Sequence, residues 1–113
     1  MQAFTGLIVD VRGLNARVAL YPRILAEGGT TVYDIATPNP NAAIEEGFVE
    51  YLKSPEDAKL RRIGTSPLIV KAKQIGGKYG ADIVLSEEDA RKVLEANRQD
   101  RFLSKAKVAV VID

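Results

Sequence analysis

The chain has 113 residues, contains neither His nor Cys, and carries a formal net charge of +1. This length suits one domain with a real core, and the missing residue types remove the commonest catalytic base, the thiol nucleophile and the usual zinc ligands. The near balance of charge argues against a dedicated nucleic-acid binder, and no apolar run approaches the roughly 20 residues that a membrane-spanning helix needs.

The first third of the chain predicts three strands. Residues 4–11 alternate between two faces, with Asp10 among apolar neighbours. Residues 17–26 predict a second strand, interrupted or bent at Pro22, because proline donates no hydrogen bond to a neighbouring strand. Gly28 and Gly29 then favour a hairpin to the third strand, since tight hairpin turns need positive φ angles.

Residues typical of helix N-termini predict three helices in the chain. Asn39 and Pro40 predict a helix over 40–52, whose apolar stripe is Ile44, Phe48, Tyr51 and Leu52. Ser54 and Pro55 predict a second, short helix over 58–62 that stops at Gly64. Ser86, followed by three acids, predicts a third helix over 86–98.

The remaining segments predict three more strands. Residues 67–75 and 81–85 form a hairpin through the glycine-rich loop 76–80. That loop lacks the spacing of a phosphate-binding loop and is followed by a strand, so we interpret it as a plain turn. Residues 107–112 form an unbroken apolar run, which is typical of a strand at the centre of a sheet.

The predicted order is therefore β-β-β-α-α-β-β-α-β, without an internal repeat, in a single α+β domain over 1–113. We expect a mixed, mostly antiparallel sheet, with helices 40–52 and 86–98 packed on one face.

The most notable polar residues are Asp10, Arg12 and Arg23. If their strands pair, Arg23 and Asp10 form a bidentate ion pair that fixes the register. The alternative is a binding site for a small molecule or an anion that uses all three residues. Lys71 is a further candidate contact, and as a base or nucleophile it would need a lowered pKa.

No catalytic, cofactor or metal site is predicted elsewhere. Four carboxylates could in principle form a metal or glycosidase-like site, but their spacing matches no metal loop: Asp34, Glu45, Glu46 and Asp57. A small basic group is better interpreted as a solvated face, because no aromatic residue interleaves with it: Lys53, Lys59, Arg61 and Arg62.

Three stretches together resemble a known family. They are Thr5–Leu14, then Ala19–Ile24 with the hairpin after it, and Arg62–Ala72 followed by Ala81–Ala90. The characteristic positions are Asp10, Arg12, Pro22, Arg23, Gly64, Pro67 and Lys71. This order resembles a domain of bacterial secreted proteins and outer-membrane lipoproteins, some related to the flagellar assembly protein T group.

The resemblance implies a non-catalytic module of the cell envelope that acts through protein–protein contacts and needs no cofactor. Its partners would be envelope proteins or a second copy of the chain, recruited by an open strand edge. The expected location is the periplasm or the outer membrane, with a lipid anchor as one option in the full-length protein. The family usually carries a leader or a lipid-attachment Cys, and the chain shows neither; we therefore expect either a trimmed mature segment or a cytosolic protein.

Overall fold

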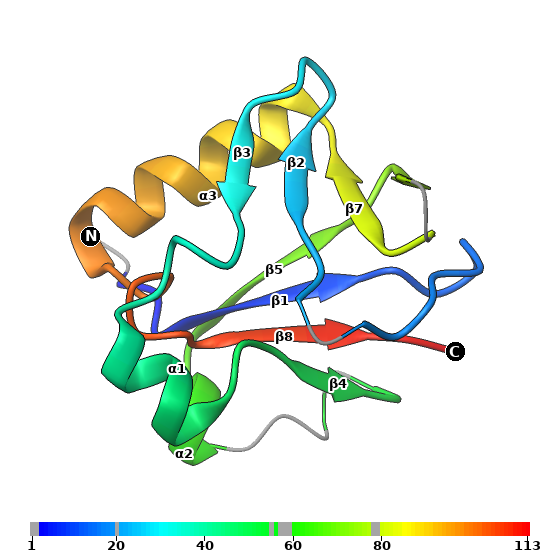
Figure 1. The fold of residues 1–113 in the computed structure, drawn as a ribbon. Helices are drawn as coiled ribbons and strands as arrows, with labels where there is room; N and C mark the ends of the chain where they lie inside the picture. The colour runs from blue at the N-terminus through cyan, green and yellow to red at the C-terminus, as the bar shows by residue number, and fades with distance from the viewer. Residues whose placement is uncertain (1–2, 20, 55, 57–59, 78–79) are drawn as a thin grey trace.

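The computed structural model describes residues 3–19, 21–54, 56, 60–77 and 80–113, and its fold is α+β, as predicted (Figure 1). The strands are β1 (Gly6–Asp10), β2 (Ile24–Ala26), β3 (Thr31–Tyr33), β4 (Glu50–Leu52), β5 (Pro67–Lys71), β6 (Gln74–Gly76), β7 (Asp82–Leu85) and β8 (Val108–Val111). The helices are α1 (Pro40–Glu46), α2 (Leu60–Ile63) and α3 (Glu87–Asp100).

The strands form two sheets rather than one. Sheet A has the order β4-β8-β1-β5, and all three of its pairings are parallel. Sheet B has the order β3-β2-β7-β6; its two hairpins are antiparallel, and β2 and β7 pair in parallel. The two predicted hairpins are thus confirmed, whereas the expectation of a single, mostly antiparallel sheet is wrong.

The cause of the second sheet lies at the end of β5. The backbone N–H of Ala72 donates to Asp10 in sheet A (2.9 Å), and the next N–H, of Lys73, donates to Val84 in sheet B (2.8 Å). The chain therefore changes sheets within one residue. The predicted strand 67–75 is in fact β5 and β6, because an apolar run alone does not show such a change of partner.

The predicted helices 40–52 and 86–98 do not share one face: Figure 1 shows α1 beside α2 below the strands of sheet A, whereas α3 lies above them. Helix α3 packs against β2, β3 and β7 of sheet B, and α2 packs against β1 and β8 of sheet A (Figure 1). Within the predicted helix over 58–62, Ala58 and Lys59 lie outside the described residues, as do Asp57 and Lys78 with Tyr79 of the glycine loop.

Helix α1 is shorter than predicted. The side chain of Asn39 accepts a hydrogen bond from Asn41 N (2.9 Å), and Pro40 opens the helix, as expected. The helix ends at Gly47, whose φ of 82° breaks the helical path, and the chain continues into β4. Ile44, assigned to the buried stripe, is 82% exposed, because the interrupted helix turns that face to solvent.

The predicted strand 17–26 is also shorter. Only β2, at its end, pairs with neighbours; residues 17–19 and 21–23 form no strand, and residue 20 lies outside the described part. Pro22 is buried in this irregular segment. A missing N–H and a fixed φ explain why regular pairing starts only after the proline.

The main core lies between sheet A, sheet B and α3. In β1, Leu7 and Val9 face this core, and Ile8 faces a second, smaller core beneath α2, which confirms the predicted alternation. Strand β8 is buried along its whole length between β4 and β1, as the apolar run predicted. Strand β8 has neighbours at both edges, so this last strand offers no open edge for pairing with a second copy of the chain.

Candidate functional site

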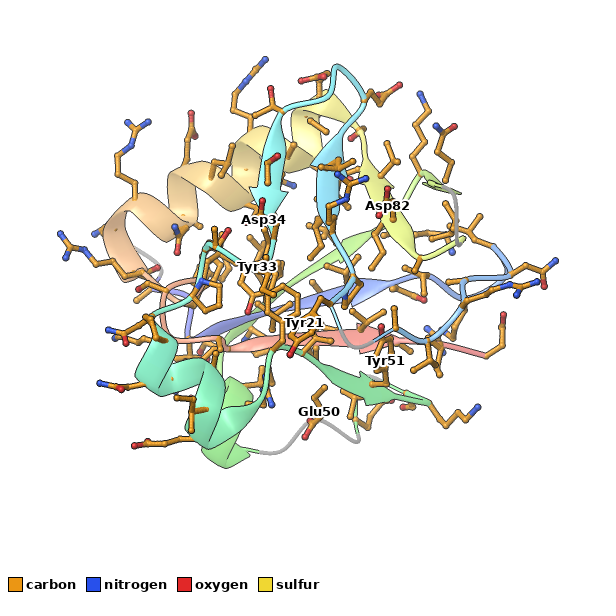
Figure 2. All side chains as sticks on the ribbon, in the orientation of Figure 1. Tyr21, Tyr33, Asp34, Glu50, Tyr51 and Asp82 are labelled. Atoms are coloured by element: carbon orange, nitrogen blue, oxygen red, sulfur yellow. The ribbon has the colours of Figure 1, made fainter. Side chains whose placement is uncertain are left out.

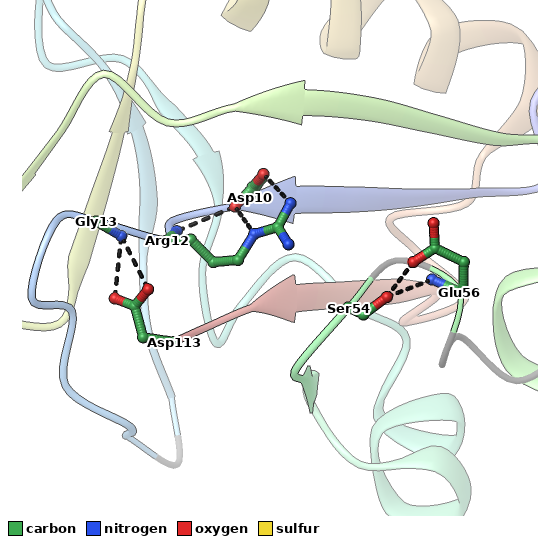
Figure 3. A network of polar contacts seen from close by, with 6 residues as sticks. All are labelled: Asp10, Arg12, Gly13, Ser54, Glu56 and Asp113. Atoms are coloured by element: carbon green, nitrogen blue, oxygen red, sulfur yellow. Dashed lines mark hydrogen bonds and ion pairs between the residues drawn. The ribbon is translucent and has the colours of Figure 1, made fainter.

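The structure separates the predicted polar residues into two places. Asp10 and Arg12 meet at the carboxyl end of β1, where Arg12 donates from Nε to Oδ1 (3.0 Å) and from Nη2 to Oδ2 (2.9 Å) (Figure 3). Arg23 lies elsewhere and forms its bidentate pair with Asp82 on β7. The expected pair of Asp10 with Arg23 is therefore wrong, because Asp10 ends β1 of sheet A whereas Arg23 directly precedes β2 of sheet B.

Lys71 joins the first group. It ends β5 and stands in register with Asp10 on β1. Hydrogen bonds from Arg12 hold the pKa of the Asp10 carboxyl below its ordinary value, and the nearby charge of Lys71 adds to this effect although partial burial opposes it. A lowered pKa keeps Asp10 ionised, which suits a residue that orients cations rather than one that transfers protons.

Further polar groups follow the other strands of sheet A at the same edge. The backbone N–H of Gly13 donates to both carboxylate oxygens of Asp113 (3.2 and 3.0 Å), and the Lys53 ammonium donates to the Asp113 carbonyl. The carboxylate of Glu56 accepts from the Ser54 hydroxyl (Figure 3), and the charge of Arg12 contributes to the lowered pKa of Glu56. We call the group Asp10, Arg12, Lys53, Glu56, Lys71 and Asp113 the carboxyl-edge cluster.

A shallow cavity of about 190 Å³ adjoins this cluster. Its lining residues directly follow β1 and β8 or belong to the loop after β1: Val11, Asn15, Ala16, Ile112 and Asp113. Asn15 adopts a φ of 57°, a left-handed conformation that asparagine tolerates better than most residues. Sequence reasoning missed this cavity, because only the parallel order of β1 and β8 brings its walls together.

A second surface feature is an apolar groove of about 390 Å³. Its walls are the irregular segment before β2 and the segment from the end of α1 into β4: Val18, Ala19, Gly47, Phe48, Val49 and Tyr51. Tyr21 packs edge-on against Phe48, with ring centroids 5.7 Å apart, although it is 57% exposed. We call this feature the Phe48 groove; the tyrosines around it are labelled in Figure 2.

Hydrogen bonds fix both walls of the groove. The Tyr51 hydroxyl donates to the carbonyl of Ala19 (2.8 Å) and accepts from its N–H (3.0 Å). Behind the other wall, buried Arg62 donates to Gly47 O (2.9 Å), and the Tyr33 hydroxyl donates to Phe48 O (2.7 Å). The carbonyls of the consecutive residues Gly47 and Phe48 thus both accept hydrogen bonds from buried side chains. The wall of the groove is therefore preformed in the free protein.

Exposed apolar side chains border this groove. Val18, in one wall, is 62% exposed. Two further exposed residues lie near groove residues in the sequence: Ile44 precedes Gly47 by three residues, and Ile35 follows by two residues Tyr33, whose ring stacks on Phe48 at 4.6 Å. Ile69, on β5 at the opposite edge of sheet A from β4, is a further large exposed apolar residue.

The remaining candidates are spread out. Asp34 accepts from the backbone N–H of Ala36 and the hydroxyl of Thr37, which gives it a role in a turn. Within the described residues no group of three acids is placed to hold a metal ion, and no helix is long and apolar enough to cross a membrane.

Comparison with known proteins adds the family. Residues 6–113 match the model of the second domain of Treponema pallidum Tp0624. The chain belongs to this family. The match spans both sheets and all three helices, and it places the chain among bacterial domains of α+β fold. No curated protein matches the chain.

Proposed function

We propose that this domain is a non-catalytic binding module that acts through protein–protein contacts in an assembly of the bacterial cell envelope. The Phe48 groove is the observation that carries the proposal. Most of the surface of a folded protein has scattered apolar residues, whereas a group of them around a hollow is typical of an interaction site. Val18 in the groove wall and Tyr21, which packs on Phe48, are exposed apolar residues at this hollow.

The composition of the groove supports the same conclusion. Aromatic side chains dominate the binding energy of many protein interfaces, because they bury a large area at a small cost in conformational entropy. Phe48 and Tyr51 line this groove, and Tyr21 borders it. The hydrogen bonds behind Gly47 and Phe48 reduce the entropy that binding would otherwise cost. The expected occupant is an apolar segment of another envelope protein.

The envelope location rests on the sequence resemblance to secreted proteins and outer-membrane lipoproteins. The relation to the flagellar assembly protein T group belongs to the same proposal, as does the lipid anchor of a full-length form. Fractionation of native cells tests the location directly: the proposal expects the protein in the periplasm or the outer membrane. Recovery in the cytosol would contradict it.

Crosslinking of the full-length protein in intact cells tests the contact surface. We expect Val18→Asp to lose a specific crosslinked protein, because a carboxylate at the groove wall opposes burial of an apolar partner. Ile69→Asp is the matched control, since Ile69 is 54% exposed on the far edge of sheet A. Equal recovery of every crosslinked protein by the two variants would rule out the groove as the contact site.

A further inference from the structure

We propose that the carboxyl edge of sheet A binds a small, singly charged oxyanion such as a carboxylate, with Arg12 as the direct donor and Lys71 as a second positive charge. Sheet A is parallel throughout, so the carboxyl ends of its strands lie along one edge. In open parallel sheets, ligands bind in the crevice outside these ends. The site is separate from the Phe48 groove and does not depend on it.

Arg12 is already oriented for such a ligand. Asp10 accepts from Arg12 Nε, Nη2 and the backbone N–H, all within 3.0 Å. The third guanidinium nitrogen, Nη1, has no partner among the described residues, and Figure 3 shows it turned away from Asp10. An arginine whose rotamer is fixed by a neighbouring carboxylate loses little entropy when it binds an anion.

Lys71 provides the second charge. Its side chain is exposed, stands in register with Asp10, and forms no hydrogen bond or ion pair with a described residue. Asp10 neutralises one of the two cations, which leaves one positive charge among Asp10, Arg12 and Lys71, although the carboxyl-edge cluster as a whole has equal numbers of cations and acids. An anion near Arg12 is therefore attracted by Lys71 as well.

Two acids limit the charge of the ligand. Both Glu56 and Asp113 interact with Arg12 through their charge, and neither forms an ion pair with it. The Ser54 hydroxyl donates a hydrogen bond to Glu56, and the N–H of Gly13 donates one to Asp113, so each donor stabilises part of the negative charge of its acid. A ligand with several negative charges would be repelled by both acids, whereas a single carboxylate meets a smaller penalty. This balance favours acetate over phosphate.

Titration of the whole chain with sodium acetate, followed by amide NMR shifts, tests the site. Ionic strength is kept constant with chloride, and sodium phosphate is the second probe. We expect saturable shifts at residues 10–13 and 71–72. We expect affinity to fall about tenfold in Arg12→Lys, the loss of about one charged hydrogen bond, and several-fold in Lys71→Met. Lys73→Met is the control, because Lys73 is also exposed but pairs with Glu27.

Each outcome decides a part of the proposal. Shifts that do not saturate, or that chloride produces equally, would overturn it. Equal affinities in Lys71→Met and Lys73→Met would remove Lys71 from the site. Tighter binding of phosphate than of acetate would overturn the assignment of a single charge. The NMR spectra also show whether each variant is folded, so that a loss of binding is distinguished from a loss of structure.

Discussion

The Tyr33 hydroxyl donates to the carbonyl of Phe48 (2.7 Å) while the two rings stack with their centroids 4.6 Å apart. One side chain thus makes both a polar and an apolar contact with the same residue. Tyr33 is fully buried, so the hydroxyl has no water to replace this acceptor. The contact joins β3 of sheet B to the segment that leads into β4 of sheet A.

Replacement of Tyr33 by Phe tests this contact. We expect Tyr33→Phe to lower the free energy of unfolding by about 1–3 kcal/mol, because it leaves a buried carbonyl without its donor. Chemical denaturation provides the measurement. Tyr21→Phe is the control: Tyr21 is more than half exposed and packs on the same ring. A similar loss in both variants would contradict the assignment.

The same tyrosine predicts how stability changes at high pH. Burial raises the pKa of the Tyr33 hydroxyl far above its ordinary value of 10.0. Above pH 10 the unfolded state can release this proton and the folded state cannot, so stability falls as pH rises toward the folded pKa. We expect denaturation curves of Tyr33→Phe to show a smaller decrease between pH 9 and 11 than those of the wild type.

Arg62 predicts a larger loss of stability. It is 7% exposed, and its Nη2 donates both to Gly47 O and to Ala106 O (2.9 Å each). We expect Arg62→Met to lower the free energy of unfolding by about 3 kcal/mol, since two charged hydrogen bonds are lost at once. Arg98→Met, at an exposed position of α3, should change it little. Thermal unfolding of both variants makes the comparison.

Asp10 predicts a dependence on acid. Its pKa is lowered in the folded state, so its contribution to stability is full above the unfolded value of 3.8 and is lost as pH falls through the folded pKa. We expect Asp10→Asn to be less stable than the wild type at pH 7 and to converge with it at low pH. Glu95→Gln, exposed on α3, is the control. A constant difference at all pH values would refute the ionic role.

A comparison of Gly29 and Gly64 distinguishes the cost of backbone strain from the cost of a steric clash. Gly29 and Gly64 have φ angles of 98° and 84°, which side chains rarely adopt. A Cβ at Gly29 meets nothing within 4 Å, whereas at Gly64 it would lie 2.5 Å from Thr5. We expect Gly29→Ala to cost about 1 kcal/mol, and Gly64→Ala to cost at least about 2 kcal/mol more because Thr5 must move. An equal decrease in the free energy of unfolding of both variants, measured by chemical denaturation, would show that Thr5 moves without an energetic penalty.

The sequence predicts much of the local structure. The caps Asn39 and Ser86, both glycine hairpins and the central position of β8 were all correctly expected. Such features depend on a few neighbouring residues or on hydrophobic periodicity, which a single chain displays directly. The length of α1 was overestimated because Phe48 and Leu52 continue a helical spacing after Gly47 has already ended the helix.

The pairing of distant strands could not be predicted in the same way. Whether Arg23 meets Asp10 or Asp82 depends on which sheet each strand joins, and no local pattern shows this. The carboxyl-edge cluster was found in part, through Asp10, Arg12 and Lys71, because charged residues at strand ends are visible in sequence. The Phe48 groove was missed, since its walls come from segments about 30 residues apart, joined by one tyrosine hydroxyl.

The position of β8 has a consequence for how the chain folds. Strands β1 and β8 are neighbours in sheet A although about a hundred residues separate them, and β4 has no other partner in that sheet (Figure 1). During synthesis, β4 therefore has no strand to pair with until residues 108–111 have left the ribosome. Pairing of strands that are distant in sequence loses chain entropy when the long loop closes, before the stabilising contacts form, and this slows folding. Sheet B and α3 are complete earlier, so we expect folding to begin there and to end with the insertion of β8.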